Sequence, residues 1–504
     1  MSESRKKKAS RNIIWGLGNK LITLVLPFAS RTIILYFLGA EFLGVGTLFS
    51  SILNFLSLTE LGLGAAIVFY MYKPLAEGDT DRICALLNYY KKLYRVIGLT
   101  MLAIGTALLP AVPFLMKSGA PEGINVYILY YIYLLNSVIS YFFAGYRSSL
   151  LTANQRVDVN TKIATIVNVL VQGTQIVLLI LYRNFYVYAC VPIAGTLCTN
   201  AAYYIITRRM YPDMNPRGTV SVETRWNIKK KISGLVGTKL NSIVVHSADT
   251  IVISTFLGLR MTAQYGNYHM IFSAVCGFIG VLFTSMTAGI GNKLVTDTME
   301  ESFRLFKKLS FLNSWIVCWC SSCFLCLYEP FMELWVGELK LGFGFACLMT
   351  AYFYIYQIQK TILTFKDAAG LWHADKMRPY VSMTVNLVSN LLLVQFIGIY
   401  GIVLSTILAF AISLPWANKV LFDNLFRMNP LTNLVRFLAD FLWTLVIAAV
   451  TYLICMVFPY TVCGLLARLA VCCVVPNLLF ALKSMRTEEL RYWKGLATRL
   501  LIRK

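Results

Sequence analysis

Runs of about twenty apolar residues, separated by short polar connections, recur along the whole chain. A helix of this length crosses the hydrocarbon core of a bilayer. The pattern predicts fourteen membrane-spanning helices, at about 13–38, 43–72, 94–116, 124–146, 163–182, 186–207, 232–257, 264–290, 309–328, 342–365, 380–398, 400–420, 437–458 and 463–482. None of the connections is long enough to fold as a separate domain. The expected fold class is therefore an all-α polytopic membrane protein.

The first apolar run, residues 12–39, contains two cations, Lys20 and Arg31. Their spacing is close to three helical turns, so they share one face of the helix, about 16 Å apart along its axis. A charge at membrane depth is costly and normally faces a cavity or a partner rather than lipid. We therefore expect Arg31 to line an interior polar space. Lys20 either lines the same space or extends toward the nearer membrane surface.

A segment similar to the first apolar run occurs 219 residues later in the chain. The two copies agree at a lysine and at two glycines: Lys20 with Lys239, Gly18 with Gly237, and Gly39 with Gly258. Two related spans that open two halves of a hydrophobic chain are typical of transporters built from internal repeats. The expected organisation is a six-helix lobe at 1–207, a cytoplasmic linker at 208–231, a second six-helix lobe at 232–420, and two extra helices with a basic cytoplasmic tail at 421–504.

The net charge is +23, and the distribution of the basic residues along the chain predicts how the protein is oriented in the membrane. Alternate connections and the two ends carry 37 of the Lys and Arg residues, whereas the intervening connections carry four. By the positive-inside rule, this asymmetry predicts a multi-pass protein of the cell membrane with both termini in the cytoplasm. The basic surface then faces anionic lipid headgroups, and nucleic acid is not an expected partner.

Three further ionisable residues are predicted at membrane depth. Glu60 lies in the second run, followed by Gly62 and Gly64, which favour close helix approach or a local break. It is the natural counter-ion of the first-run cations, either as a structural partner or as an ion-coupling group. In the second copy, His246 and Asp249 form either a structural pair or a proton site.

Tyrosines cluster in two spans that occupy corresponding positions in the two halves. The span at 124–146 contains Tyr131 and ends at Arg147, and the span at 342–365 contains Tyr356 and Lys360. Aromatic rings at helical spacing usually face lipid, pack in the core or form belts at the membrane ends, and their clustering in matching spans also allows a surface on which sugars stack. These four residues are therefore candidate substrate contacts.

Several kinds of chemistry have no sequence signal. The chain has no Gly-Lys-Ser/Thr loop for phosphates and no arrangement typical of a Ser-His-Asp triad, so an enzyme is not expected. The four cysteines of 318–326 imitate a metal-ligand spacing, but buried cysteine usually packs as a small apolar residue. No metal or other cofactor is expected, and coupling to H⁺ or Na⁺ is left open.

The segment ASRTIILYFLGAEFLGVGTLFSSILNFLSLTELGLGAAIVF resembles the N-terminal region of bacterial polysaccharide (Wzx-like) flippases. These belong to the larger superfamily that includes MATE exporters and the lipid II flippase. The segment AGLWHADKMRP resembles a later connection of the same family. The likeness is strong at the start of the chain and weaker elsewhere.

The resemblance implies two six-helix bundles around a cavity that opens to either side of the membrane. It implies export of a polyprenyl-pyrophosphate-linked oligosaccharide, with a polysaccharide polymerase and glycosyltransferases as partners. Arg31, Lys20 and Lys239 would then attract the pyrophosphate. Two alternatives are a MATE-type multidrug or cation antiporter, in which Glu60 or Asp249 couples transport to ions, and a membrane-bound glycan polymerase or ligase.

Overall fold

The computed structural model describes residues 25–502 except Leu61 and Ser118. Lys20 lies outside these residues, as do the side chains of Lys239 and His246. The described residues contain no strand, which confirms the all-α prediction. Contacts divide the chain into two compact units, Met1–Ala263 and Gln264–Lys504, which we call the N-terminal and C-terminal units.

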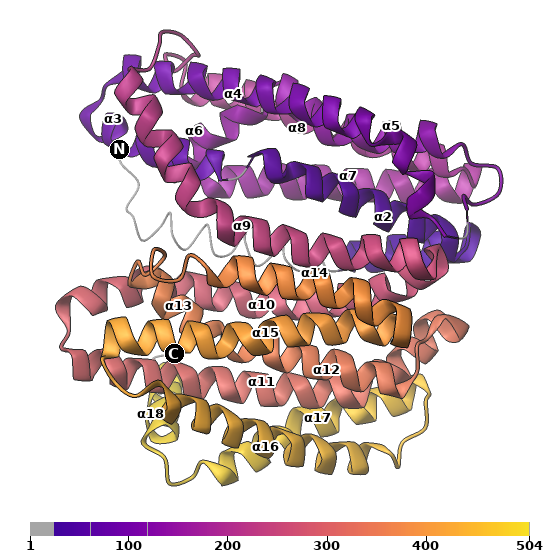
Figure 1. Cartoon of the computed structure of the whole chain (residues 1–504), viewed down its shortest axis with the longest axis vertical. Helices are drawn as coiled ribbons and strands as arrows, with labels where there is room; N and C mark the ends of the chain where they lie inside the picture. Colours follow the sequence, from indigo (N-terminus) through magenta and orange to yellow (C-terminus); the bar gives the residue numbers. More distant parts are fainter. Residues whose placement is uncertain (1–24, 61, 118, 503–504) are drawn as a thin grey trace. The chain divides into compact units, whose positions relative to one another are not determined.

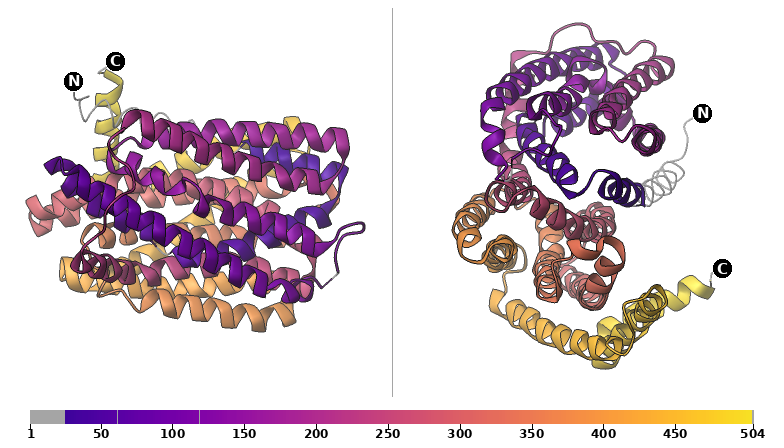
Figure 2. Two further views of the ribbon diagram at one scale, coloured as in Figure 1. Left: turned by 90° about the horizontal axis from the view of Figure 1, so that it is seen from above. Right: turned by 90° about the vertical axis from the view of Figure 1, so that its right-hand side faces the viewer.

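Helices of the N-terminal unit lie side by side, and an end-on view shows them in cross-section (Figures 1 and 2). A first helix covers Val25–Phe37. It is followed by α2 (Ala40–Leu56), η1 (Ser57–Glu60), α3 (Leu63–Glu77), α4 (Thr80–Ala107), η2 (Leu109–Ala111), η3 (Pro113–Leu115), α5 (Val126–Phe142), η4 (Gly145–Arg147), α6 (Ser148–Ala153), α7 (Val157–Tyr182), α8 (Phe185–Met210) and α9 (Val222–Leu257).

The C-terminal unit is built around a long central helix, α11 (Met299–Val336), which packs against α12, α16 and α17. The other elements are α10 (Leu259–Thr296), η5 (Gly337–Leu339), α12 (Phe343–Ile358), α13 (Lys360–Ala368), α14 (Arg378–Ile397), α15 (Ile399–Leu421), η6 (Phe422–Phe426), α16 (Pro430–Cys455), α17 (Val462–Lys483) and α18 (Glu488–Ile502). The first residues of α10, up to Ala263, belong to the N-terminal unit.

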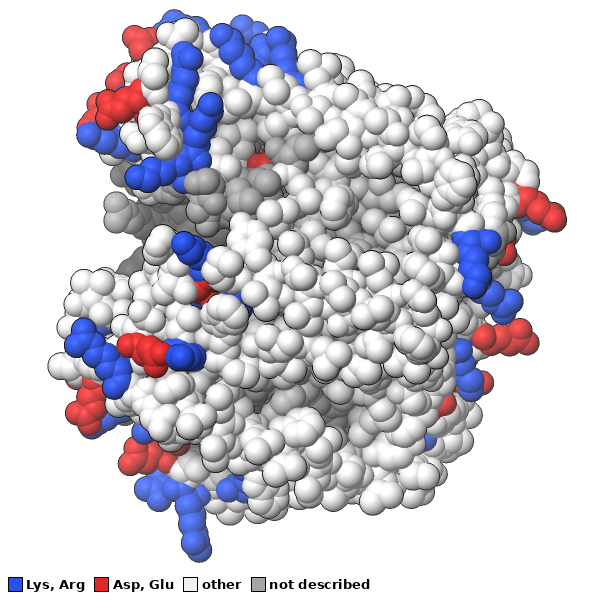
Figure 3. Space-filling view, viewed as in Figure 1, with Lys and Arg blue, Asp and Glu red and all other residues white. Residues whose placement is uncertain are grey.

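In the part of the chain that is described, nine helices are long and apolar enough to cross a membrane, or ten when a pair bent by 54° counts as one span. The other predicted spans fall on shorter, broken or partly described helices, at 25–37, 40–77, 222–257 and 343–358. On the face drawn in Figure 3, charged side chains of each unit gather at the helix ends, with uncharged surface between them. This distribution is that of a polytopic membrane protein.

The second predicted span is broken in the middle. Helix α2 ends at Leu56, a 3₁₀ turn carries Glu60, and α3 begins after Gly62, whose backbone is left-handed (φ 75°). A Cβ atom on Gly64 would lie 2.9 Å from the Tyr90 hydroxyl, so this glycine lets α4 approach closely. The two glycines provide both the break and the close packing that the sequence favours.

The internal repeat is visible in the backbone at its best-matched turn. Gly39 has φ 96° and ψ 177°, and Gly258 has φ 92° and ψ 175°. Each donates its N–H, over 3.1 Å, to the carbonyl five residues earlier, from Gly39 to Ile34 and from Gly258 to Ile253. These angles lie in a region that only glycine occupies readily. The 219-residue shift therefore aligns two turns of the same geometry.

A second correspondence links the two tyrosine-rich spans. Helix α5 breaks at residues 143–144 and continues, after η4, as the short α6. Helix α12 ends at Ile358, and the short α13 follows after Gln359. In both units a span is thus followed by one short helix and a polar turn.

The predicted linker, 208–231, is mostly helical, because α8 runs to Met210 and α9 begins at Val222. Only residues 211–221 form a loop, and two side chains of α4 hold this loop in place. The Asn88 side chain donates to the Gly218 carbonyl over 2.8 Å, and Arg217 pairs with Asp81 at 2.8 Å. Helix α9 packs on α2 and α3 and lies within the N-terminal unit.

Candidate functional site

The N-terminal unit contains a pocket of about 580 Å³ whose lining, as far as the described residues supply it, is polar but uncharged. Amides, hydroxyls and tyrosines from α2, η1, α5, α7 and α8 make up most of it: Ser50, Asn54, Ser57, Tyr133, Asn136, Ser137, Tyr141, Asn168, Gln172, Gln175 and Tyr188. Five smaller or apolar side chains complete it: Leu53, Met101, Val171, Ala189 and Pro192. We call this the amide pocket. Such a lining offers both donors and acceptors to a neutral polar ligand.

Helical spacing explains why the amides converge. Asn168, Gln172 and Gln175 follow one another at four and three positions along α7, so they lie on one face of that helix. Tyr133, Ser137 and Tyr141 repeat every four positions along α5 and form the facing wall.

Some polar side chains of this lining are bonded within the protein, and others can still bond to a ligand. The Gln175 amide donates to the Tyr188 carbonyl over 3.0 Å, and the Thr196 hydroxyl donates to Asn136 over 2.9 Å. By contrast, the buried Oε1 atom of Gln172 has no hydrogen-bond partner among the described residues. A buried acceptor without a partner is costly. Gln172 is therefore the lining residue best placed to gain a bond from a ligand hydroxyl.

Arg31 lies at the edge of this region. It lines a second pocket of about 260 Å³ that shares Ser50, Tyr133 and Tyr188 with the amide pocket. Its guanidinium donates to the Ala263 carbonyl at 3.5 Å. The structure therefore places the Arg31 cation at a pocket that adjoins the amide pocket.

Glu60 is held by tyrosine hydroxyls. Its two carboxylate oxygens accept hydrogen bonds from Tyr94 at 3.0 Å and from Tyr141 at 2.8 Å, and Tyr90 donates to Tyr94 at 3.1 Å. Within the described residues, tyrosines therefore take the place that the sequence assigned to the first-run cations. Tyr141 also lines the amide pocket, so the Glu60 network reaches that pocket through one side chain.

Arg147 is buried at the break after α5, away from the pocket lining. Its guanidinium donates to Thr207 and to Asn215, each at 3.2 Å, and lies over the Tyr204 ring. It therefore joins α8 and the 211–221 loop to the end of α5.

The remaining predicted site residues that the structure describes lie in four other places. Tyr131 is half-buried against the apolar core of the N-terminal unit, and Asp249 is buried in α9. Tyr356 packs in an aromatic group of the C-terminal unit with Phe272 and Phe410. Lys360 begins α13 and is half-buried.

The sequence analysis missed the amides of α7, although their signal is present. Three amide side chains at i, i+4 and i+7 within an otherwise apolar span are unusual, because each is costly toward lipid. It also selected Tyr131, whereas the lining tyrosines of α5 are two and ten residues farther on. Which tyrosine faces the pocket depends on the rotation of α5, and that rotation is set by packing.

The comparisons with known proteins support the fold. No protein-family model matches the chain. An uncharacterized membrane protein of Methanocaldococcus jannaschii is 21% identical over 447 residues, which cover 84% of this chain and 85% of that protein.

Solved structures of transporters match most of the chain. The lipid II flippase MurJ, in an inward closed conformation, matches with a TM-score of 0.64 and 16% identity over 94% of this chain and 98% of its own. An inward-facing MATE multidrug transporter of the MOP superfamily matches with a TM-score of 0.61 and 15% identity over 81% and 97%. The chain therefore has the fold of these membrane transporters.

Proposed function

We propose that this protein is a flippase that moves polyprenyl-pyrophosphate-linked oligosaccharide repeat units across the cytoplasmic membrane for surface polysaccharide synthesis. The observation that carries the proposal is the neutral amide pocket with Arg31 beside it. Sugar hydroxyls both donate and accept hydrogen bonds, as do amide side chains and tyrosines. A pyrophosphate is an anion that a guanidinium binds by charge-assisted, two-pronged hydrogen bonds. The fold shared with a lipid II flippase favours a lipid-linked substrate.

On this proposal, each part of the substrate has its own contact. The sugars lie against Gln172, Asn136 and Tyr133, and the pyrophosphate is held by Arg31 together with Lys20 and Lys239. The polyprenyl chain stays in the membrane. Glu60, Asp249 and His246 balance these charges or couple the movement to an ion gradient.

The proposal is tested with the full-length protein in liposomes that contain a polyprenyl-pyrophosphate oligosaccharide. The measurement is the fraction of sugar accessible to an added glycosidase over time. We expect protein-dependent movement in the wild type, and a large loss in both Arg31→Gln and Gln172→Leu. Gln395→Leu, at an exposed position of α14, is the matched control and should move substrate normally. Equal rates in all three variants, or no movement by the wild type, would refute the proposal.

The second candidate is a MATE-type multidrug or cation antiporter. The Glu60 carboxylate, joined to the pocket through Tyr141, favours it, as does the shared MATE fold. Arg31 argues against it, because a cation at the pocket edge repels a cationic drug. Uptake of a cationic dye into the same liposomes under an H⁺ or Na⁺ gradient separates the two. Dye movement that is lost in Glu60→Gln, without movement of the lipid-linked sugar, would establish the antiporter.

A further inference from the structure

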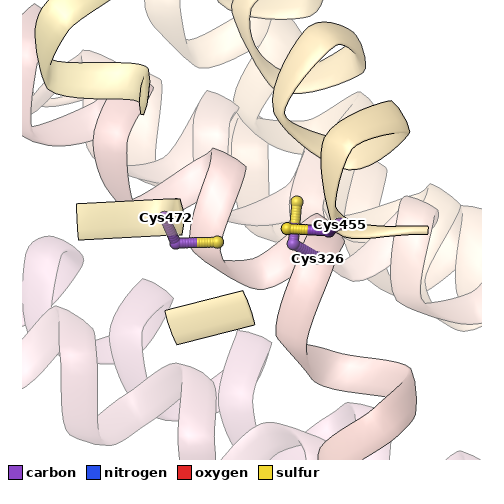
Figure 4. A group of neighbouring side chains, drawn as sticks. All are labelled: Cys326, Cys455 and Cys472. Atoms are coloured by element: carbon purple, nitrogen blue, oxygen red, sulfur yellow. The ribbon is translucent and has the colours of Figure 1, made fainter. Parts of the chain in front are cut away.

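Three cysteines from three different helices converge in the C-terminal unit. Cys326 lies on α11, Cys455 is the last residue of α16, and Cys472 lies on α17. All three side chains are fully buried, and their Sγ atoms lie within 4.8 Å of one another. Figure 4 shows the thiols of Cys326 and Cys455 together and the Cys472 thiol pointing toward them. Of the four cysteines in 318–326, Cys326 joins two residues more than 120 positions away, and Cys323 packs against the group.

We propose that Cys326, Cys455 and Cys472 form a binding site for Cu(I) that fastens α16 and α17 to α11. Three sulfurs placed symmetrically around one metal ion at about 2.3 Å are separated from one another by about 4 Å, which matches the observed grouping. Thiolates are soft ligands that select Cu(I), zinc and iron–sulfur clusters.

The surroundings favour Cu(I) over zinc. Structural zinc takes four ligands, whereas in the described part of the chain this group supplies three. The side chains packed around it are those of Cys323, Leu327, Tyr452 and Val471, and the Cys323 thiol lies outside the group of mutually close sulfurs. Cu(I) is stable with three sulfur ligands or fewer, so it fits this group.

A buried cation accompanies the thiols. Arg468 lies one turn before Cys472 on α17, and its side chain is buried. Its guanidinium donates to the carbonyls of Phe458 (2.6 Å) and Cys326 (3.4 Å), and its own carbonyl accepts from the Cys455 thiol at 4.0 Å. The arginine is thus directed into the protein rather than extended toward the membrane surface, as a lone arginine near a helix end would be.

Charge and electrons balance without an oxidant. Cu⁺ keeps its oxidation state, two thiols release their protons to solvent, and the third coordinates as a neutral thiol. Two thiolates around Cu⁺ carry one net negative charge, and the Arg468 guanidinium offsets it. Metal binding is coupled in this way to the packing of three helices, and it stabilises the folded chain.

The test uses the full-length protein in detergent, reduced and then freed of reductant without oxygen. Cu(I) is titrated against the chelator bathocuproine disulfonate, and thermal unfolding is measured with and without the metal. We expect one Cu(I) per chain and a higher melting temperature when it is bound. Cys326→Ser, Cys455→Ser and Cys472→Ser should each weaken binding by about a hundredfold or more and remove the metal-dependent rise in melting temperature.

Cys473→Ser is the matched control, because this cysteine neighbours Cys472 but is exposed. It should bind Cu(I) like the wild type. The proposal is overturned if the wild type binds no Cu(I), if it takes Zn²⁺ but not Cu(I), or if Cys473→Ser loses binding as Cys472→Ser does. A disulfide between any two of the three thiols, found by mass spectrometry in protein isolated without reductant, also overturns it. None of these results depends on what the protein transports.

Discussion

The Tyr141 hydroxyl donates a hydrogen bond of 2.8 Å to Glu60, and this bond ties α5 to the turn that divides the second span. Tyr94 of α4 donates to the other carboxylate oxygen, so three segments meet at one acidic side chain. Two hydrogen bonds to its oxygens compensate a carboxylate in part for the loss of water around it. The break between α2 and α3 is therefore held in place from both neighbouring helices.

Removing one donor from this network should destabilise the N-terminal unit. We expect Tyr141→Phe to lower the free energy of unfolding by about 2 kcal/mol, because a hydrogen bond to a charged group is lost. Thermal unfolding in detergent measures the effect. Tyr127→Phe on the same helix is the control, since that side chain is exposed at the start of α5 and should tolerate the change. Equal melting temperatures for the two variants would contradict the role assigned to the bond.

The two repeat-related turns should respond alike to substitution. Alanine at Gly39 or at Gly258 must adopt a backbone that is strained for any residue with a Cβ atom, which costs on the order of 1–3 kcal/mol. Gly39 has open space around it, so the cost there is one of backbone conformation and not of crowding.

Gly173→Ala on α7 is the control for both glycine variants. This glycine is helical and also has open space, so alanine should leave stability unchanged or raise it by about 1 kcal/mol. If Gly39→Ala and Gly258→Ala melt at the wild-type temperature, the turns do not require glycine.

A buried charge cluster in the C-terminal unit should depend on Asp375. Its carboxylate pairs with Lys366 and accepts from Arg378 at 2.8 Å, while Arg378 also donates to Ser413 of α15 at 2.7 Å. Asp375→Ala would remove the buried carboxylate from Arg378 and leave Lys366 with only the half-exposed Asp367, at a cost of about 3–5 kcal/mol.

Asp367→Ala provides the comparison for Asp375→Ala. Asp367 also lies near Lys366, at 3.6 Å, but its side chain is half exposed. Asp367→Ala should lower the free energy of unfolding by no more than about 1 kcal/mol. Similar losses of expression and melting temperature in the two variants would show that the buried pairing is not what stabilises this turn.

The proposed pyrophosphate contact makes a further prediction at Arg31. Arg31→Lys keeps the positive charge but loses the planar fork of donors, so transport of the lipid-linked oligosaccharide should fall between the wild type and Arg31→Gln. The liposome assay measures all three, and the melting temperature of each variant checks the fold. A lysine variant as inactive as the glutamine variant would mean that charge alone does not hold the substrate.

The membrane spans are the best-predicted feature, because a helix of about twenty apolar residues is far more stable in the bilayer core than in water. The repeat was also readable, since the glycines of its turn are required by backbone geometry at Gly39 and Gly258 alike. The unit boundary was not readable in the same way. Helix α9 packs on α2 and α3 through contacts that no local pattern records.

Sequence by itself determined which residues are costly in apolar surroundings: it predicted that Arg31 and Glu60 avoid lipid, and that the cysteines of 318–326 pack as small apolar residues. Only the tertiary structure decided which partners meet those needs, namely tyrosines for Glu60 and two distant thiols for Cys326. The physical reason is that periodicity gives the face of a helix but not its rotation against its neighbours. That rotation is set by the packing of many side chains at once.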